Sequence, residues 1–267
     1  NVPIAFALML LTGICPLLAW RKASFQNLKK NFFTPFLTAL LSLIVLVVFG
    51  MRHVYALISF FLIIFVLATI IMEFYRGGRA RKEMTGENQV EATTKLVWRN
   101  KRRYGGYIVH VGMMVMFIGI TGSSAFNTEK QATLKPGETL KIRNYVVRYD
   151  GLKRVPSQHK HAVWANLTLF NAGKELGVLR PEKTFFKGQE QPTTEVAIRS
   201  TLKEDFYAIL AGYDEKGTAT LKILINPLVV WIWIGGGILT VGSVIAMWPD
   251  QREKKRAAAR YTKEALI

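Results

Sequence analysis

The chain has 267 residues, 50% of them hydrophobic, and carries 36 Lys and Arg against 18 Asp and Glu, a formal net charge of +18. The basic residues cluster beside long apolar runs, which is typical of membrane spans joined by cytoplasmic loops. Nucleic-acid binding, the other common reason for a basic chain, is disfavoured because few aromatic residues are interleaved with these clusters. The single cysteine, Cys15, excludes an internal disulfide and a CxxC redox pair.

Five apolar runs are predicted to cross a membrane, because each is close to the roughly 20 residues that a hydrocarbon core of about 30 Å requires. Pro35 suits the first turn of the second run. The chain begins at Asn1 without a methionine, which indicates a piece of a longer protein. The runs are Val2–Trp20, Phe33–Phe49, Val54–Met72, Tyr107–Ile120 and Pro227–Trp248, with a short surface helix expected over Asn88–Trp98.

Lysine and arginine predict the orientation of these spans. The segments after the first, third and fifth runs are all rich in basic residues, and five spans place all three on one side. That side is therefore expected to be cytoplasmic. The predicted organisation is a membrane domain of four spans over residues 1–122, an outer β-rich domain over 123–225, a fifth span over 226–248 and a basic cytoplasmic tail over 249–267.

The outer region has about 100 residues, enough for a domain with its own core. Apolar and polar residues alternate in short runs separated by turns such as Pro136-Gly137 and Asp150-Gly151, which predicts a small barrel or sandwich. The fold class is thus an α-helical polytopic membrane protein with an inserted extracytoplasmic β-rich domain. Strands are predicted over residues 139–142, 145–149, 163–170, 195–198, 205–211 and 219–225.

His110 is the residue that most directly suggests chemistry, because it lies in the fourth apolar run, about 9 Å along a helix from Tyr104. A histidine at that depth is costly without a partner. Gly105, Gly112 and Gly119 recur every seven residues, which allows close approach of another backbone or of a flat cofactor. Two interpretations stay open: a hydrogen bond to a neighbouring helix, or axial ligation of haem iron.

The remaining polar candidates carry weaker signals. His53, between the second and third runs, suits an interfacial residue or a contact to a propionate or phosphate. His159 and His161 lack the further ligands that zinc needs and are predicted to lie in a solvated loop. Glu73 is expected to pair with Arg76 at the membrane interface.

Four stretches together resemble a known family. Arg99–Gly112, which contains His110, resembles the histidine-bearing helix of CcmF-type cytochrome c haem lyases, a haem-handling family that also includes NrfE and CcsA. Glu73–Gly77, Leu134–Glu138 and Asn226–Gly236 are similar to other parts of that family. The resemblance covers essentially the whole chain but only the carboxyl-terminal part of the family's length.

The resemblance implies a bacterial inner-membrane protein whose β-domain lies in the periplasm and which helps to attach haem covalently to apocytochrome c. It implies that His110 is an axial ligand of an intramembrane haem b, with the second histidine in the amino-terminal part of the enzyme. Expected partners are membrane lipid, apocytochrome c, a haem chaperone, other maturation subunits and that amino-terminal part. The alternatives are a non-enzymatic scaffold of the same complex and a membrane transporter, which predicts repeated, broken spans.

Overall fold

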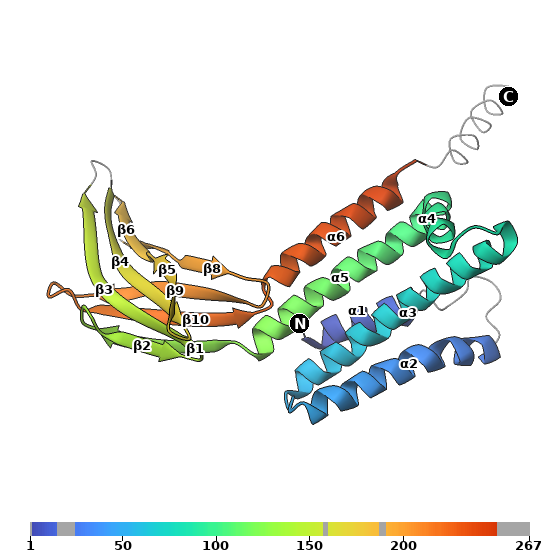
Figure 1. The fold of residues 1–267 in the computed structure, drawn as a ribbon. Helices are drawn as coiled ribbons and strands as arrows, with labels where there is room; N and C mark the ends of the chain where they lie inside the picture. Colours follow the sequence, from blue (N-terminus) through green and yellow to red (C-terminus); the bar gives the residue numbers. More distant parts are fainter. Residues whose placement is uncertain (1, 15–24, 157–159, 187–190, 250–267) are drawn as a thin grey trace, which may run out of the picture. The chain divides into compact units, whose positions relative to one another are not determined.

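The computed structural model describes residues 2–14, 25–156, 160–186 and 191–249 (Figure 1). The chain divides into two compact units, each described by itself. Residues 122–230 form a β-rich unit, and the residues on either side of them in the sequence form a helical unit. This is the fold class that the sequence predicts, a helical protein with an inserted β-rich domain.

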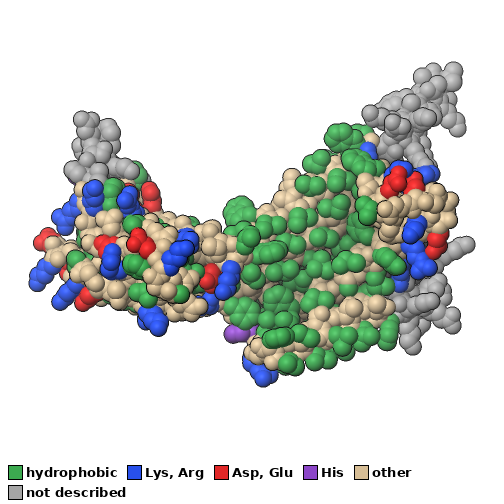
Figure 2. All heavy atoms as spheres, viewed as in Figure 1, with side chains coloured by type: hydrophobic (Ala, Val, Ile, Leu, Met, Phe, Trp, Pro, Cys, Tyr) green, Lys and Arg blue, Asp and Glu red, His purple; other side chains and the backbone are tan. Residues whose placement is uncertain are grey.

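Among the described residues, three helices, α3, α5 and α6, are long and apolar enough to cross a membrane. The shorter apolar helices are α1 and the part of α2 over Phe32–Val48, and the first predicted run continues beyond α1 into residues outside the described ranges. Figure 2 shows hydrophobic side chains over much of the visible face of this unit, with most of its charged side chains around α4. The helices are α1 (Val2–Ile14), α2 (Phe25–Val48), α3 (Val54–Thr85), α4 (Gln89–Arg99), α5 (Lys101–Ala125) and α6 (Val230–Met247).

Helices α2, α3, α5 and α6 have boundaries that differ from the predicted ones, and α5 extends beyond its predicted run at both ends. Helix α3 continues to Thr85, well beyond the apolar run, and ends where Gly86 adopts a left-handed conformation (φ 71°) and donates its amide to the Lys82 carbonyl. Helix α2 begins at Phe25, so Pro35 lies inside the helix and not in its first turn. Helix α6 begins at Val230, later than the predicted start at residue 226, because the preceding residues still pair in a β-ladder.

Helix α4 confirms the short helix predicted over Asn88–Trp98, and it packs against the polar end of α3. Its place on the membrane surface stays a prediction. A Cβ atom on Gly78 of α3 would lie close to the Thr93 hydroxyl, so the glycine allows the two helices to approach closely. Glu87, in the connection, accepts hydrogen bonds from Arg81 (2.8 Å) and Lys95 (2.9 Å). The bond from Arg81, followed by that from Lys95, lowers the pKa of Glu87 to about 2.

Acid is therefore expected to loosen the junction between α3 and α4. A carboxyl whose folded-state pKa is depressed stabilises the fold above its unfolded pKa of 4.5, and this stabilisation is lost as the pH falls toward about 2. Hydrogen–deuterium exchange of the α4 amides, corrected for the intrinsic pH dependence of exchange, should increase over that range. Glu87→Gln should exchange faster at neutral pH and lose the pH dependence; an unchanged profile in this variant would contradict the assignment.

The β-rich unit is a sandwich of two antiparallel sheets with the strand orders β1-β10-β9-β8 and β2-β3-β4-β6-β7, and β5 pairs with β4. Five of the six predicted strands are present. The sixth, over residues 195–198, instead spans the end of β7 and the start of β8, which belong to different sheets, and β1, β5 and β6 are additional. The strands are β1 (Thr128–Leu134), β2 (Thr139–Ile142), β3 (Tyr145–Pro156), β4 (Lys160–Asn171), β5 (Lys174–Leu179), β6 (Glu182–Phe186), β7 (Thr193–Glu195), β8 (Ala197–Ser200), β9 (Glu204–Tyr213) and β10 (Ala219–Pro227).

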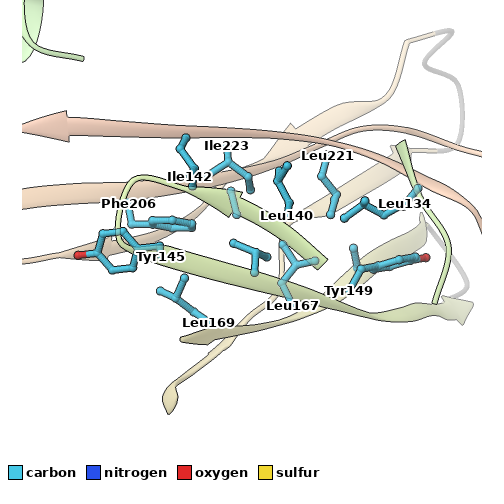
Figure 3. Close-up of a cluster of buried hydrophobic side chains, with 14 of the residues drawn as sticks. Leu134, Leu140, Ile142, Tyr145, Tyr149, Leu167, Leu169, Phe206, Leu221 and Ile223 are labelled. Carbon is cyan, nitrogen blue, oxygen red and sulfur yellow. The ribbon is translucent and has the colours of Figure 1, made fainter. Parts of the chain in front are cut away.

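The core of the sandwich comes from alternate residues of both sheets (Figure 3). Leu167 and Leu169 of β4 face Leu221 and Ile223 of β10, and all four are at most 1% exposed. Alternation with period two sends every second side chain inward, so the pattern that predicts the strands also predicts this core. Tyr149 is buried among them, and its hydroxyl donates a hydrogen bond to the Gly217 carbonyl (2.7 Å).

Candidate functional site

The candidate site is centred on His110 in α5. The imidazole is half-buried, and its Nδ1 atom is fully buried without a hydrogen-bond partner among the residues that the structure describes. A buried polar atom without a hydrogen-bond partner lowers the stability of a folded protein by about 1–3 kcal/mol, so such atoms are rare in native proteins. Of the two interpretations left open by the sequence, the hydrogen bond to a neighbouring helix is therefore not supported by the described contacts at Nδ1.

The helical repeat aligns His110 with residues that contact α3. Tyr107, His110 and Thr121 lie along one face of α5, because their spacing follows the i, i+3, i+14 rows of a helix. At one end of this face Tyr107 contacts Glu73, and at the other the Thr121 hydroxyl lies 2.6 Å from that of Ser59. The two contacts are about four helical turns apart on α3 and equally far apart on α5, and they occur in opposite order along the two helices. Helices α3 and α5 therefore run antiparallel, with His110 between the two contacts.

The stretch of α3 between those contacts is mostly apolar. Val66 and Ile70 are at most 1% exposed and belong to the same apolar cluster as Tyr107 and Met114. The hydroxyl of Thr69 donates to the Phe65 carbonyl (2.8 Å). Neither this hydroxyl nor any other group of the described residues makes a hydrogen bond to Nδ1 of His110.

A polar cluster lies one turn from His110. Arg103 donates to Glu73 (2.5 Å) and to the Tyr107 hydroxyl (2.9 Å), and that hydroxyl lies 3.4 Å from Glu73. The Glu73 side chain is 15% exposed, whereas that of Arg103 is 58% exposed. These contacts join Glu73 to α5, across 30 residues of sequence. The predicted pair of Glu73 with Arg76 stays a prediction. The cluster fixes the register of α5 on α3 and hence the level of His110.

Removing the Glu73 carboxylate is expected to weaken this register. Because Arg103 is largely exposed, the loss should be about 1 kcal/mol, nearer to a surface ion pair than to a buried one. Glu73→Gln should therefore lower the thermal midpoint of the helical unit by a few degrees, measured by circular dichroism in detergent. Glu83→Gln is the matched control, because its ion pair with Arg79 has both side chains 63% exposed. Equal midpoints for the two variants would show that the cluster has no such role.

Glycines on the other side of α5 make its contact with α6. A Cβ atom on Gly112 would lie 2.5 Å from the Leu239 backbone nitrogen, and one on Gly105 would lie 2.6 Å from that of Ala246. Gly235 and Gly242 of α6 make equally close approaches to α5. The glycine repeat is predicted to allow close approach of another backbone or of a flat cofactor. At these positions it allows close approach of the α6 backbone. The face of α5 that carries His110 is not the glycine face.

The other predicted polar residues do not join this site. His53 is exposed and immediately precedes α3. His161 lies in strand β4 and not in a loop, and His159 lies outside the described residues. Within the described ranges, no group of three or more His, Cys, Asp or Glu side chains is placed to hold a metal ion. Cys15 is also outside these ranges.

A concavity lies in the β-rich unit. It has a volume of about 500 Å³ and is lined from both sheets, with Arg154, His161 and Phe185 on one side and Tyr213 and Glu215 on the other. Its lining contains a positively charged, a negatively charged and several aromatic side chains. Such a cleft suits contact with another polypeptide or an amphipathic molecule better than it suits metal binding.

These features define a class of protein: a helical membrane protein with an inserted β-sandwich and one histidine held in an apolar helix pair. Residues 125–227 match the family model of the CcmF C-terminal beta-sandwich. The resemblance inferred from the sequence is confirmed: the chain is similar, over nearly its whole length, to the carboxyl-terminal part of CcmF-type proteins.

The similar proteins include three cytochrome c biogenesis proteins. The chain is 26% identical to "Cytochrome c-type biogenesis protein CcmF" of Pseudomonas aeruginosa over 99% of its own length and 39% of that protein. It is 28% identical to CcmF of Escherichia coli over 60% of its own length and 24% of that protein. It is 26% identical to "Probable cytochrome c-type biogenesis protein NrfE" of Escherichia coli, over 56% and 26% respectively.

A solved structure has the same fold. The structure named "Cytochrome c Heme Lyase CcmF" superposes with a TM-score of 0.74 at 22% identity, covering 93% of this chain and 39% of that one. The chain therefore spans about two fifths of the length of this structure and of the Pseudomonas aeruginosa relative.

Proposed function

We propose that the chain is the carboxyl-terminal part of a haem lyase that attaches haem to apocytochrome c, and that His110 is one axial ligand of a haem b held within the membrane. The similarity to CcmF-type biogenesis proteins over 99% of the chain supports the role in cytochrome c maturation. It does not distinguish a catalytic part from a scaffold, so the haem assignment depends on the site itself.

One observation carries the haem assignment: His110 has a buried ring nitrogen, and none of the described residues gives it a partner. An imidazole nitrogen in such surroundings is available to bind a metal ion. Neutral histidine is a common axial ligand of haem iron. The residues present fit one side of a haem. The second ligand would have to come from outside this chain's apolar helices, as the resemblance implies.

The roles of the chain's own residues follow from their contacts. His110 would hold the iron, while the Glu73–Arg103–Tyr107 cluster sets the height of the histidine against α3. The glycine contact with α6 supports the opposite side of α5, so the histidine helix is held on two faces. Val66 and Ile70 keep the neighbouring stretch of α3 apolar. When bound, the haem would supply one-electron transfer, which keeps the iron of the substrate haem reduced during attachment.

The orientation proposed for the chain follows from its basic segments. The junction around α4 carries the densest cluster of Lys and Arg, which favours the cytoplasmic side of a bacterial inner membrane. The sandwich is joined to the opposite ends of α5 and α6, at Ala125 and Val230, and would therefore lie in the periplasm. There it is a candidate dock for apocytochrome c or for a haem chaperone.

Deleting the coding segment from its own host tests the function. We expect covalently bound haem to disappear from the c-type cytochromes, seen as loss of haem-stained bands on denaturing gels, while b-type cytochromes remain. Restoring the segment should restore the bands. Normal haem staining in the deletion strain, with no second copy of the gene, would contradict the proposal.

A further inference from the structure

Helices α4, α5 and α6 meet at a cation held between two indole rings. The ammonium group of Lys101 lies 5.1 Å from the ring centre of Trp98, at the end of α4, and 5.9 Å from that of Trp248, just after α6. The two tryptophans are 55% and 57% exposed. Exposed indoles at the ends of apolar helices are typical of the membrane–water interface, where the ring sits at headgroup level.

Within the part of the chain that the structure describes, Arg99 and Lys101 have no acidic partner. The sequence has no Asp or Glu between Glu91 and Glu129, and no ion pair of Arg99 or Lys101 occurs among the described residues. Lys101 also begins α5, where the helix dipole disfavours positive charge. A positive charge at the start of a helix is unfavourable, and natural sequences keep unfavourable local features mainly at functional sites. A bound anion would offset this positive charge.

The apolar surface beside the cluster indicates what carries that anion. Met247 and Val244, in the last turns of α6, are 82% and 53% exposed and lie one and four residues before Trp248 in the sequence. A free phosphate ion would use only the cationic part of this surface. A phospholipid would use both parts, because its headgroup meets the cations while its chains lie along α6.

We propose that Arg99, Lys101, Trp98 and Trp248 form a binding site for the phosphate headgroup of an anionic phospholipid. The site lies within the helical unit and does not depend on the haem assignment. Its physical basis is the combination of exposed indoles, adjoining apolar surface and two cations that form no ion pair with the described residues. Its consequence is that α4, α5 and α6 are held together at the bilayer surface through a lipid that all three contact.

Tryptophan quenching by brominated lipids tests this site in the full protein reconstituted in nanodiscs. Brominated phosphatidylglycerol and brominated phosphatidylcholine are compared at the same mole fraction. The signal of Trp98 and Trp248 is obtained by subtracting a Trp98→Phe/Trp248→Phe variant. We expect about fivefold enrichment of the anionic lipid at these two rings, the effect of one basic residue at an anionic surface.

Lys101→Gln and Arg99→Gln should each reduce the enrichment, and the double variant should abolish it. Lys82→Gln, which removes the same charge from the last turn of α3, is the matched control and should retain it. Far-UV circular dichroism identifies any variant that has lost its helices. Arg99→Gln is the variant with the least expected effect on folding, because Arg99 is solvent-exposed at the end of α4. Equal quenching by the two lipids in the wild type, or enrichment that survives in the folded double variant, would overturn the proposal. Loss of enrichment on addition of inorganic phosphate, with no loss on addition of chloride at the same ionic strength, would also overturn it, because the site would then prefer the free ion.

Discussion

Replacing His110 with alanine is expected to abolish the b-type absorbance of the protein complex purified from membranes. The change removes the one imidazole of the chain's described apolar helices and leaves the iron without a ligand on this side. Haem would then dissociate during purification, and the reduced-minus-oxidised spectrum should lose its b-type bands. Covalent attachment of haem to c-type cytochromes should fall with it, to a few per cent or less, since iron reduction fails.

The control for this variant is His53→Ala, which removes an exposed histidine outside α5. It should retain the full b-type spectrum. Far-UV circular dichroism should show that His110→Ala keeps its helices, because the buried Nδ1 atom makes no hydrogen bond with the described residues that its loss could break. A wild-type spectrum in a folded His110→Ala protein would exclude the histidine as a ligand.

Replacing Gly112 with alanine is expected to separate α5 from α6. The new Cβ would lie 2.5 Å from the Leu239 nitrogen and 2.7 Å from the Gly235 carbonyl oxygen. Both are backbone atoms, so no side chain can rotate away and the helices themselves must move. Overpacking of this kind costs about 1–3 kcal/mol, and the loss of packing between membrane helices adds to it. The thermal midpoint should fall by several degrees, and the haem content should fall with it.

Gly106 offers a matched control on the same helix. A Cβ atom there would meet nothing within 4 Å. Alanine is a better helix former than glycine by about 1 kcal/mol, so Gly106→Ala should leave the midpoint unchanged or raise it. The two variants make the same chemical change six residues apart and should move the midpoint in opposite directions. A fall of the same size in both would show that glycine at these positions is needed for a reason other than the contact with α6.

The sequence predicts the elements whose signal is local. The strands over residues 139–142, 163–170 and 219–225 alternate cleanly because one face of each is buried in the sandwich core. Strand β1 was missed because its residues TEKQATL are mostly polar, which suits an edge strand with a single fully buried residue, Leu134. Strand β5 was missed for the same reason, because it pairs only with β4 and exposes most of its side chains.

The candidate site was only half predictable. His110 is visible in the sequence because a histidine in an apolar run breaks a strong pattern. The contact of Glu73 with Arg103 is not visible, because it depends on the antiparallel packing of α3 on α5 and joins residues 30 positions apart. The glycine repeat predicts a close approach, but only the structure identifies α6 as the neighbour and separates the glycine face from the histidine face.

The boundary errors have a common physical cause. Hydropathy marks where apolar residues end, whereas a helix ends where its backbone hydrogen bonds end. Helix α3 therefore continues through Arg79 and Glu83, which pair one turn apart, until Gly86 terminates it. At the other end of the chain, Asn226 and Pro227 are counted with the apolar run by composition but pair with β9 through the backbone.

The central claim is that the imidazole of His110 binds haem iron, and the most direct test exchanges the ligand without removing it. Electron paramagnetic resonance of the ferric haem reports the axial ligands through its g values. In a His110→Met complex that still contains haem, we predict a shift of these values from those of the wild type, because a thioether would replace one nitrogen ligand. Unchanged g values at full haem occupancy would contradict the claim.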